Sequence, residues 1–82
     1  MSRTPVVTVY TRAGCKLCAD AERIVDDVAA ARARIERIDI DADPALTARY
    51  TVRVPVVAVN GEELFELVVD PDGLRAALAV VR

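Results

Sequence analysis

The sequence has no histidine and no tryptophan, and aromatic residues make up only 4% of its 82 residues. The absence of an imidazole excludes catalytic dyads and triads built on histidine. It also excludes the usual zinc sites that mix histidine with cysteine. Long hydrophobic runs are missing too, because the longest apolar stretches, such as 54–59, fall far short of the ~20 residues that span a bilayer. We therefore expect no membrane contact.

Neither sign of charge dominates the chain. Lys and Arg number 11 and Asp and Glu number 13, which gives a net charge of -2, and both signs are scattered along the sequence. No basic patch predicts binding to nucleic acid or anionic lipid. The N-terminal residues lead directly into a strand-like run, without the apolar core of a signal peptide. We therefore expect a cytoplasmic protein, acting as a monomer.

The composition that remains is that of a small folded domain. Hydrophobic residues make up 54% of the chain and charged residues 29%, a balance that supports a packed core. At ~100 to 200 residues per domain, the chain forms a single domain over residues 1–82. It has room for one small site.

Hydrophobic periodicity in the first half alternates between strand and helix. A β-branched run at 6–10 predicts a strand buried on both faces and hence central in a sheet, and alternation at 35–40 predicts a half-exposed edge strand. Between them, apolar residues at three- and four-residue steps predict a helix from Cys15 to about Ala31. Its buried stripe is formed by Leu17, Ala21, Ile24, Val25 and Val28.

The second half is divided by turn and capping signals. Asp43-Pro44 and Asp70-Pro71 each place a capping residue before a proline, which predicts that a helix begins at both points. Asn60-Gly61 predicts a type I′ turn between strands at 54–59 and 63–68. The buried residues expected on the two helices are Leu46, Tyr50, Leu74, Leu78 and Val81. The order β-α-β-α-β-β-α predicts an α/β fold, a four-stranded mixed sheet with helices on both faces.

The two cysteines lie three residues apart, at Cys15 and Cys18, where the first strand passes into the first helix. Residues i and i+3 of a helix have Cβ atoms ~5 to 6 Å apart, whereas a relaxed disulfide needs ~3.5 to 4.5 Å. A bond between them would be strained and easily reduced, which suits a redox couple better than a permanent crosslink. The helix N-terminus and the nearby Arg12 and Lys16 favour the thiolate of Cys15. Cys15 is therefore predicted to attack, and Cys18 to resolve the mixed disulfide.

Other uses of a C-x-x-C pair stay open. Zinc needs about four ligands, and this chain offers two thiols and no imidazole, so a metal site would require a second subunit or unusual carboxylates. Structural cysteines are a further alternative. We predict no metal site within a single chain.

Four more residues are candidates for substrate binding. Pro55 opens an apolar strand, either as a simple strand-start proline or as a cis-proline that leaves the backbone of Val54 free to pair with an extended substrate. Arg12 and Arg53 are either solvated surface arginines or anchors for a carboxylate of a thiol substrate.

Acidic and aromatic residues near these positions have simpler interpretations. Asp39, Asp41 and Asp43 are spaced like metal ligands, but the run alone supplies too few oxygens, and we interpret it as a strand end followed by a helix cap. Tyr10 and Tyr50 are expected in the core or at its rim.

The segment 10–18, Tyr-Thr-Arg-Ala-Gly-Cys-Lys-Leu-Cys, followed later by Val54-Pro55-Val56-Val57 and Asn60-Gly61, resembles the glutaredoxin family. It looks closest to small glutaredoxin-like proteins with a Gly-Cys-x-Leu-Cys site. The resemblance covers nearly the whole chain and implies a thioredoxin-like fold of the glutaredoxin type. It also implies that Cys15 and Cys18 form a redox-active disulfide, that Pro55 is the cis-proline, and that Arg12 meets a glutathione carboxylate.

Two departures from the family weaken the expectation of glutathione. The usual Cys-Pro-Tyr-Cys is replaced by Cys15-Lys16-Leu17-Cys18, and the Gly-Gly-acidic segment that holds the γ-glutamyl end of glutathione is absent. Arg53 also stands where the family usually has threonine.

The resemblance therefore implies a thiol-disulfide oxidoreductase that reduces protein or mixed disulfides and holds no bound cofactor. Its partners would be a disulfide-containing protein substrate and an electron donor, either glutathione, another low-molecular-weight thiol, or a reductase. Two alternatives stay open. One is a dimer that binds zinc or an iron-sulfur cluster through Cys15. The other is a non-catalytic adapter that uses the surface of the fold.

Overall fold

The computed structural model describes residues 4–80 and contains one four-stranded sheet with the strand order β2-β1-β3-β4. The strands are β1 (Val6–Thr11), β2 (Arg34–Asp39), β3 (Val56–Val59) and β4 (Glu62–Glu66). β1 pairs in parallel with β2 and antiparallel with β3, and β3 pairs antiparallel with β4. The sheet is mixed, with β1 inside it and β2 at an edge, as the sequence predicts.

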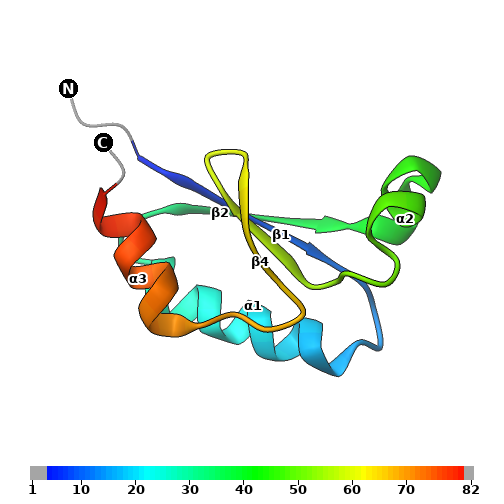
Figure 1. Ribbon diagram of the computed structural model, residues 1–82, viewed down its shortest axis with the longest axis horizontal. Coiled ribbons are helices and arrows are strands. Elements are labelled where there is room, and N and C mark those ends of the chain that lie inside the picture. The colour runs from blue at the N-terminus through cyan, green and yellow to red at the C-terminus, as the bar shows by residue number, and fades with distance from the viewer. Residues whose placement is uncertain (1–3, 81–82) are drawn as a thin grey trace.

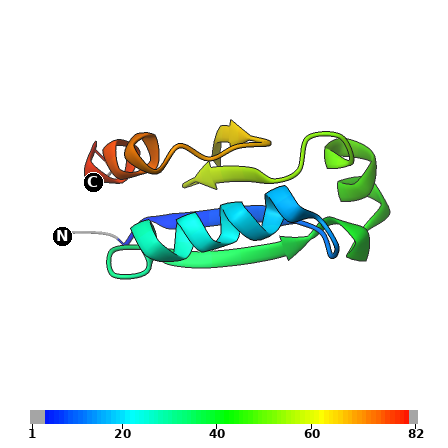
Figure 2. The same cartoon turned by 90° about the horizontal axis from the view of Figure 1, so that it is seen from below.

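The helices lie on both faces of this sheet, which confirms the predicted fold class. They are α1 (Lys16–Ala29), α2 (Pro44–Tyr50), which follows a short 3₁₀ turn η1 (Ile40–Ala42), and α3 (Pro71–Val80). α1 and α3 cover one face, where the core contains Val7, Val9, Ala21, Val25, Val57, Val59, Leu74 and Leu78. α2 lies at the end of the sheet away from α3 (Figure 1), and Tyr50 packs against the opposite face. Figure 2 shows α1 running along the sheet beside β1 and β2.

The predicted turn between β3 and β4 is confirmed. Asn60 and Gly61 have φ values of 50° and 87°, so both central residues adopt the left-handed conformation that a type I′ turn requires. The Asn60 side chain also accepts a hydrogen bond from the Val6 N–H at 2.9 Å, which ties the turn to the start of β1.

Several predicted boundaries were wrong by one or two residues. The first helix begins after Cys15, not at it, and ends at Ala29. Ile40 leaves the strand and is fully buried in η1. β3 begins only at Val56, since 54–55 form a loop, and β4 ends at Glu66. Val81, predicted in the buried stripe of α3, lies outside the described residues.

One side chain of the predicted buried stripe of α1 is instead at the surface. Leu17 is 44% exposed, whereas Ala21, Val25 and Val28 are buried. Leu17 lies in the first turn of α1, where Cys18 is the residue that faces the core. Within residues 4–80, no helix has the length and apolar character needed to cross a membrane.

Candidate dithiol site

Cys15 is the N-cap residue of α1. Its backbone is extended, with φ -98° and ψ 113°, and its Sγ accepts a hydrogen bond from the Cys18 N–H at 3.1 Å. This is the geometry in which N-cap side chains satisfy a free amide of the first helical turn. The sulfur is partly exposed, so an incoming group can reach it, and negative charge on it would face a backbone donor and the positive end of the helix.

Cys18 occupies the opposite environment. It is fully buried and packs with Ile40, Tyr50 and Val56. Burial raises the pKa of the Cys18 thiol, and the hydrogen bond with Cys15 adds to this, against smaller lowering effects from Arg12 and Thr11. Both cysteines are free thiols. The structure therefore brings together one accessible sulfur and one buried sulfur that stays protonated at neutral pH.

Val54 and Pro55 form the loop that leads into β3, and the peptide bond between them is cis. The expectation that the Val54 backbone is free was wrong for its N–H, which donates to the Tyr50 carbonyl at 3.1 Å. The Pro55 carbonyl accepts from the Leu67 N–H at 2.8 Å. The loop is thus hydrogen-bonded to α2 on one side and to the segment after β4 on the other.

Arg12 is paired within the chain. Its guanidinium makes two hydrogen bonds to Asp41, of 2.6 Å and 3.1 Å, and a weaker one to the Thr51 carbonyl at 3.4 Å. The hydrogen bonds from Arg12 lower the pKa of the Asp41 carboxyl. Arg12 therefore connects the end of β1 to η1 and to the C-terminus of α2, and a substrate carboxylate would have to displace Asp41 to reach it.

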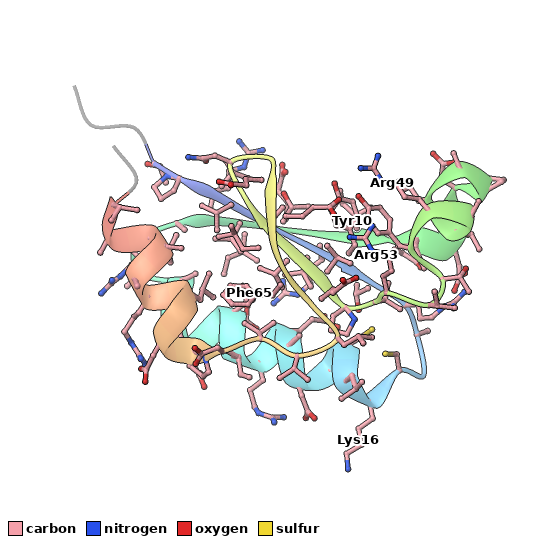
Figure 3. The ribbon with its side chains drawn as sticks, viewed as in Figure 1. Tyr10, Lys16, Arg49, Arg53 and Phe65 are labelled. Carbon is pink, nitrogen blue, oxygen red and sulfur yellow. The ribbon has the colours of Figure 1, made fainter. Side chains whose placement is uncertain are left out.

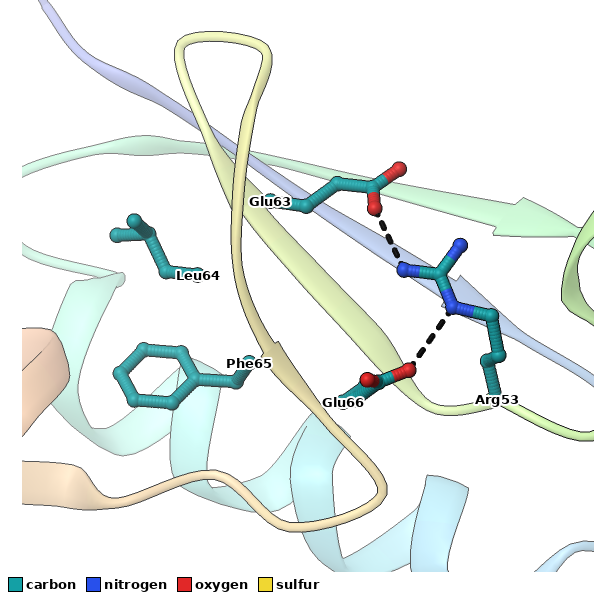
Figure 4. A pocket seen from close by; sticks show the side chains of 5 residues that line it. All are labelled: Arg53, Glu63, Leu64, Phe65 and Glu66. Carbon is teal, nitrogen blue, oxygen red and sulfur yellow. Dashed lines mark hydrogen bonds and ion pairs between the residues drawn. The ribbon is translucent and has the colours of Figure 1, made fainter.

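Arg53 is paired in the same way, with two carboxylates of β4. It lies 2.7 Å from Glu63 and 2.8 Å from Glu66, and the three side chains line a small pocket of about 130 Å³ (Figure 4). These contacts raise the pKa of Arg53 above its ordinary value. Arg12 and Arg53 are both partly exposed at the surface, and each pairs with carboxylates of the chain itself. Neither therefore presents an unpaired guanidinium to a ligand.

Asp41, Glu63 and Glu66 could not be identified from the sequence as partners of these arginines. Strict alternation would place Glu63 and Glu66, three residues apart, on opposite faces of β4. The register between β3 and β4 shifts between Val57 and Ala58, so that Glu63 pairs with Ala58 and Glu66 with Val56. Such a bulge puts both carboxylates on one face. No signal in the sequence marks its position.

The two tyrosines stack at the rim of the core, as expected. Their ring centroids lie 4.4 Å apart at an interplanar angle of 22°. Tyr50 is 2% exposed, and its hydroxyl donates to Glu63 at 2.7 Å. Burial, with a further contribution from Glu63, raises the pKa of Tyr50 to about 12. Figure 3 shows Tyr10, Arg49 and Arg53 gathered beside α2, while Lys16 points away from the body of the molecule.

The acidic run 39–43 has the place predicted for it, a strand end followed by a helix cap. The side chain of Asp39 accepts from the Asp41 N–H, and that of Asp43 accepts from the Ala45 N–H at the start of α2. Among the described residues, no group of three or more acidic or cysteine side chains is arranged to hold a metal ion.

Apolar side chains flank the dithiol. A groove of about 260 Å³ lies between α1 and the segment after β4, and its lining includes Leu17, Ile24, Leu67 and Val68. Leu17, Leu67 and Val68 are 44%, 43% and 68% exposed. Exposed apolar side chains gathered in this way are typical of surfaces that contact other proteins.

Comparison with known proteins identifies the family. The family profile described as Glutaredoxin-like domain (DUF836) matches residues 6–79, almost the whole chain. The chain belongs to this glutaredoxin-like family. An uncharacterized protein of Mycobacterium tuberculosis is 36% identical over 85 residues, covering 96% of this chain and 87% of that protein.

Solved structures agree with the family assignment. A structural-genomics target protein from X. campestris has a TM-score of 0.77 and 34% identity, covering 93% of this chain and 99% of that one. A mutant thioredoxin from Halobacterium salinarum has a TM-score of 0.68 and 29% identity, covering 93% and 73%. Mitochondrial thioredoxin 3 from Saccharomyces cerevisiae, at 15% identity and a TM-score of 0.66, shares the fold. The predicted family and the thioredoxin-like fold are thus confirmed.

Proposed function

We propose that this glutaredoxin-like protein is a thiol-disulfide oxidoreductase that reduces protein or mixed disulfides through Cys15 and Cys18. The observation that carries the proposal is the contrast between the two sulfurs. Cys15 is accessible at the N-terminus of α1 with a backbone donor on its Sγ, and Cys18 is buried one turn further on. An exposed attacking thiol beside a buried resolving thiol suits disulfide exchange.

The reaction proceeds in two exchanges. The Cys15 thiolate attacks one sulfur of the substrate disulfide, a Cys15-substrate disulfide forms, and the other substrate sulfur leaves as a thiolate that takes up a proton. The Cys18 thiol then loses its proton and attacks Cys15 Sγ, which releases the second substrate thiol and leaves a Cys15–Cys18 disulfide. Two electrons pass from the protein to the substrate, and an external thiol or a reductase returns them.

The substrate would lie against Val54 and Pro55, with its apolar residues near Leu17 and Leu67. Because the N–H of Val54 is already bonded to Tyr50, pairing with a substrate backbone would use the Val54 carbonyl. The pairing of Arg12 with Asp41 and of Arg53 with Glu63 and Glu66 favours electron donors that need no carboxylate anchor. We place the reaction in the cytoplasm, where thiols are kept reduced, and propose that the protein acts as a monomer.

Trapping with single-cysteine variants tests the proposal. The reduced wild-type protein is given a disulfide-linked peptide pair, with dithiothreitol as electron donor and a protein-free reaction as the background. The two single-cysteine variants are first reduced, freed of dithiothreitol and then given the same peptide pair, because free dithiothreitol would cleave a trapped mixed disulfide. The products are separated by mass spectrometry. We expect turnover by the wild-type protein, a stable one-to-one mixed disulfide through Cys15 in Cys18→Ser, and no adduct with Cys15→Ser. An adduct with Cys15→Ser but none with Cys18→Ser would contradict the assigned roles. Absence of exchange by the wild-type protein would reject the function.

A further inference from the structure

Glu63 binds three donors with its two carboxylate oxygens. Oε2 accepts the Tyr50 hydroxyl at 2.7 Å and lies 3.5 Å from the Arg49 guanidinium, while Oε1 accepts from Arg53 at 2.7 Å. These hydrogen bonds lower the pKa of Glu63, so the carboxylate is charged at neutral pH. Although Glu63 belongs to β4, every one of these donors belongs to the segment 49–53 that leads into Val54 and Pro55.

Backbone hydrogen bonds also connect this segment to the loop that follows it. The Tyr50 carbonyl accepts from the N–H groups of Arg53 at 2.8 Å and Val54 at 3.1 Å. Tyr50 is therefore fixed at both ends, by Glu63 at its hydroxyl and by the loop at its carbonyl. The guanidiniums of Arg49 and Arg53 each lie 5.3 Å from the centroid of its ring, and Tyr10 stacks on it.

Glu63 and Glu66 differ in the side chains that they contact and in their exposure. Within residues 4–80, the Glu66 side chain pairs with Arg53 alone and is 53% exposed. The Glu63 side chain is 27% exposed and joins Arg53 to a buried tyrosine. Loss of Glu63 would leave the hydroxyl of a buried residue without its acceptor, which is costlier than loss of a surface ion pair. Figure 4 shows Glu63 and Glu66 on the same side of β4 as Arg53, with Leu64 and Phe65 on the other.

We propose that Glu63 is a positioning residue for disulfide exchange. It holds Tyr50 and Arg53 from the edge strand and so sets where Val54 and Pro55 lie when a substrate binds against them. This inference rests on the proposed function, because the loop matters to the reaction only if the dithiol exchanges disulfides. Glu63 itself need not touch the substrate.

Glu63→Gln tests the inference, because the amide keeps the size of the side chain but has one acceptor oxygen, so it cannot accept from Tyr50 and Arg53 through separate oxygens. Glu62→Gln is the matched control, an exposed residue of the same strand with the same change of charge. The first readout is the hydrogen exchange rate of the Val54 amide, measured by NMR. We expect it to rise at least about tenfold in Glu63→Gln, since ionic hydrogen bonds are lost, and not in Glu62→Gln.

The second readout is steady-state reduction of the disulfide-linked peptide pair. We expect kcat/KM of Glu63→Gln to fall about tenfold, mainly through KM, because the binding loop is displaced while the dithiol is intact. Alkylation of Cys15 by iodoacetamide should keep its wild-type rate. A fall in thermal stability with kcat/KM unchanged would show a purely structural role and overturn the inference, as would unchanged Val54 exchange.

Two further variants cover the case in which Glu63→Gln does not fold. Tyr50→Phe removes only the hydroxyl, and Glu66→Gln removes only the negative charge of the second partner of Arg53. We expect Tyr50→Phe to speed Val54 exchange more than Glu66→Gln does, and the reverse order would overturn the role of Glu63. If the wild-type protein exchanges no disulfide, the proposed function fails, while Val54 exchange still decides whether Glu63 holds the loop.

Discussion

Only two residues separate Cys15 from Cys18, but the two thiols lie in different environments. The chain turns into α1 between them, so Cys15 caps the helix at the surface and Cys18 points into the core with Ile40 and Val56. The N-terminus of the helix acts on the sulfur of Cys15, whereas burial acts on the sulfur of Cys18. This difference suits Cys15 to the role of nucleophile and Cys18 to that of resolving thiol.

Burial of Cys18 predicts how the stability of the reduced protein depends on pH. Because the pKa of Cys18 is raised in the folded state, the unfolded chain loses this proton first as pH rises. The free energy of unfolding should therefore fall as pH increases beyond the ordinary thiol pKa of about 8.5, and level off above the folded pKa. Below about 8.5 this contribution is fully present.

Urea titrations of the wild-type protein and Cys18→Ala between neutral and alkaline pH measure this effect, with Cys15 present in both. The alanine variant is expected to be less stable at neutral pH because a cavity replaces the sulfur, but to lose less stability as pH rises. Parallel pH dependence of the two proteins would show that Cys18 titrates alike in the folded and unfolded chain.

At the scale of elements, the segment between β4 and α3 contains an unusual backbone. Leu67 has φ 68°, a left-handed conformation that favours glycine. Its side chain is 43% exposed. Its N–H is bonded to the Pro55 carbonyl, which holds the segment against the loop of the candidate site. Gly61 in the β3–β4 turn has a comparable φ of 87°.

Leu67→Gly should therefore cost little. A left-handed conformation costs an L-residue ~1 to 2 kcal/mol, and relief of this strain offsets the lost apolar contacts, so we expect the free energy of unfolding to change by less than about 1 kcal/mol. Gly61→Ala should lower it by about 1 kcal/mol or more, because alanine brings the strain that glycine avoids.

Leu64→Gly is the control for the same chemical change in a strand, where Leu64 is 37% exposed and its φ is not positive. It should destabilise the protein by ~1 to 2 kcal/mol, through lost apolar area and the entropy of glycine in a strand. Equal costs for Leu64→Gly and Leu67→Gly in urea unfolding would mean that the backbone at Leu67 stores no strain.

Over the whole molecule, stability depends on a core of small aliphatic side chains. Domains have roughly 0.05 to 0.15 kcal/mol of stability per residue, so a chain of this size has a small total. Leu74 is the fully buried leucine through which α3 packs on α1 and the sheet. Its loss affects the contact between two helices and the central strands together.

Leu74→Ala is expected to lower the free energy of unfolding by ~3 to 5 kcal/mol, a large share of the total. Val80→Ala, at a position of the same helix that is 75% exposed, should change it by less than about 0.5 kcal/mol. Denaturant unfolding followed by circular dichroism measures both. A cost below about 1 kcal/mol for Leu74→Ala would mean that α3 contributes little to the core.

The order of elements and the place of the two cysteines were readable from the sequence. Periodicity of the apolar residues, the two Asp-Pro caps and Asn60-Gly61 are local signals, set by neighbours a few residues apart, and the structure confirms the elements they predict. The resemblance carried by residues 10–18 and 54–61 likewise predicted the family. These features depend on the backbone preferences of short segments, so the sequence by itself determines them.

The contacts of the candidate site were decided by tertiary structure. Arg12 meets Asp41 across 29 residues, and the position of the bulge in β4, which no local signal marks, brings Glu63 and Glu66 together on Arg53. Ion pairs and bulges depend on register and on distances between segments far apart in the chain, and a side chain has no partner until those segments pack.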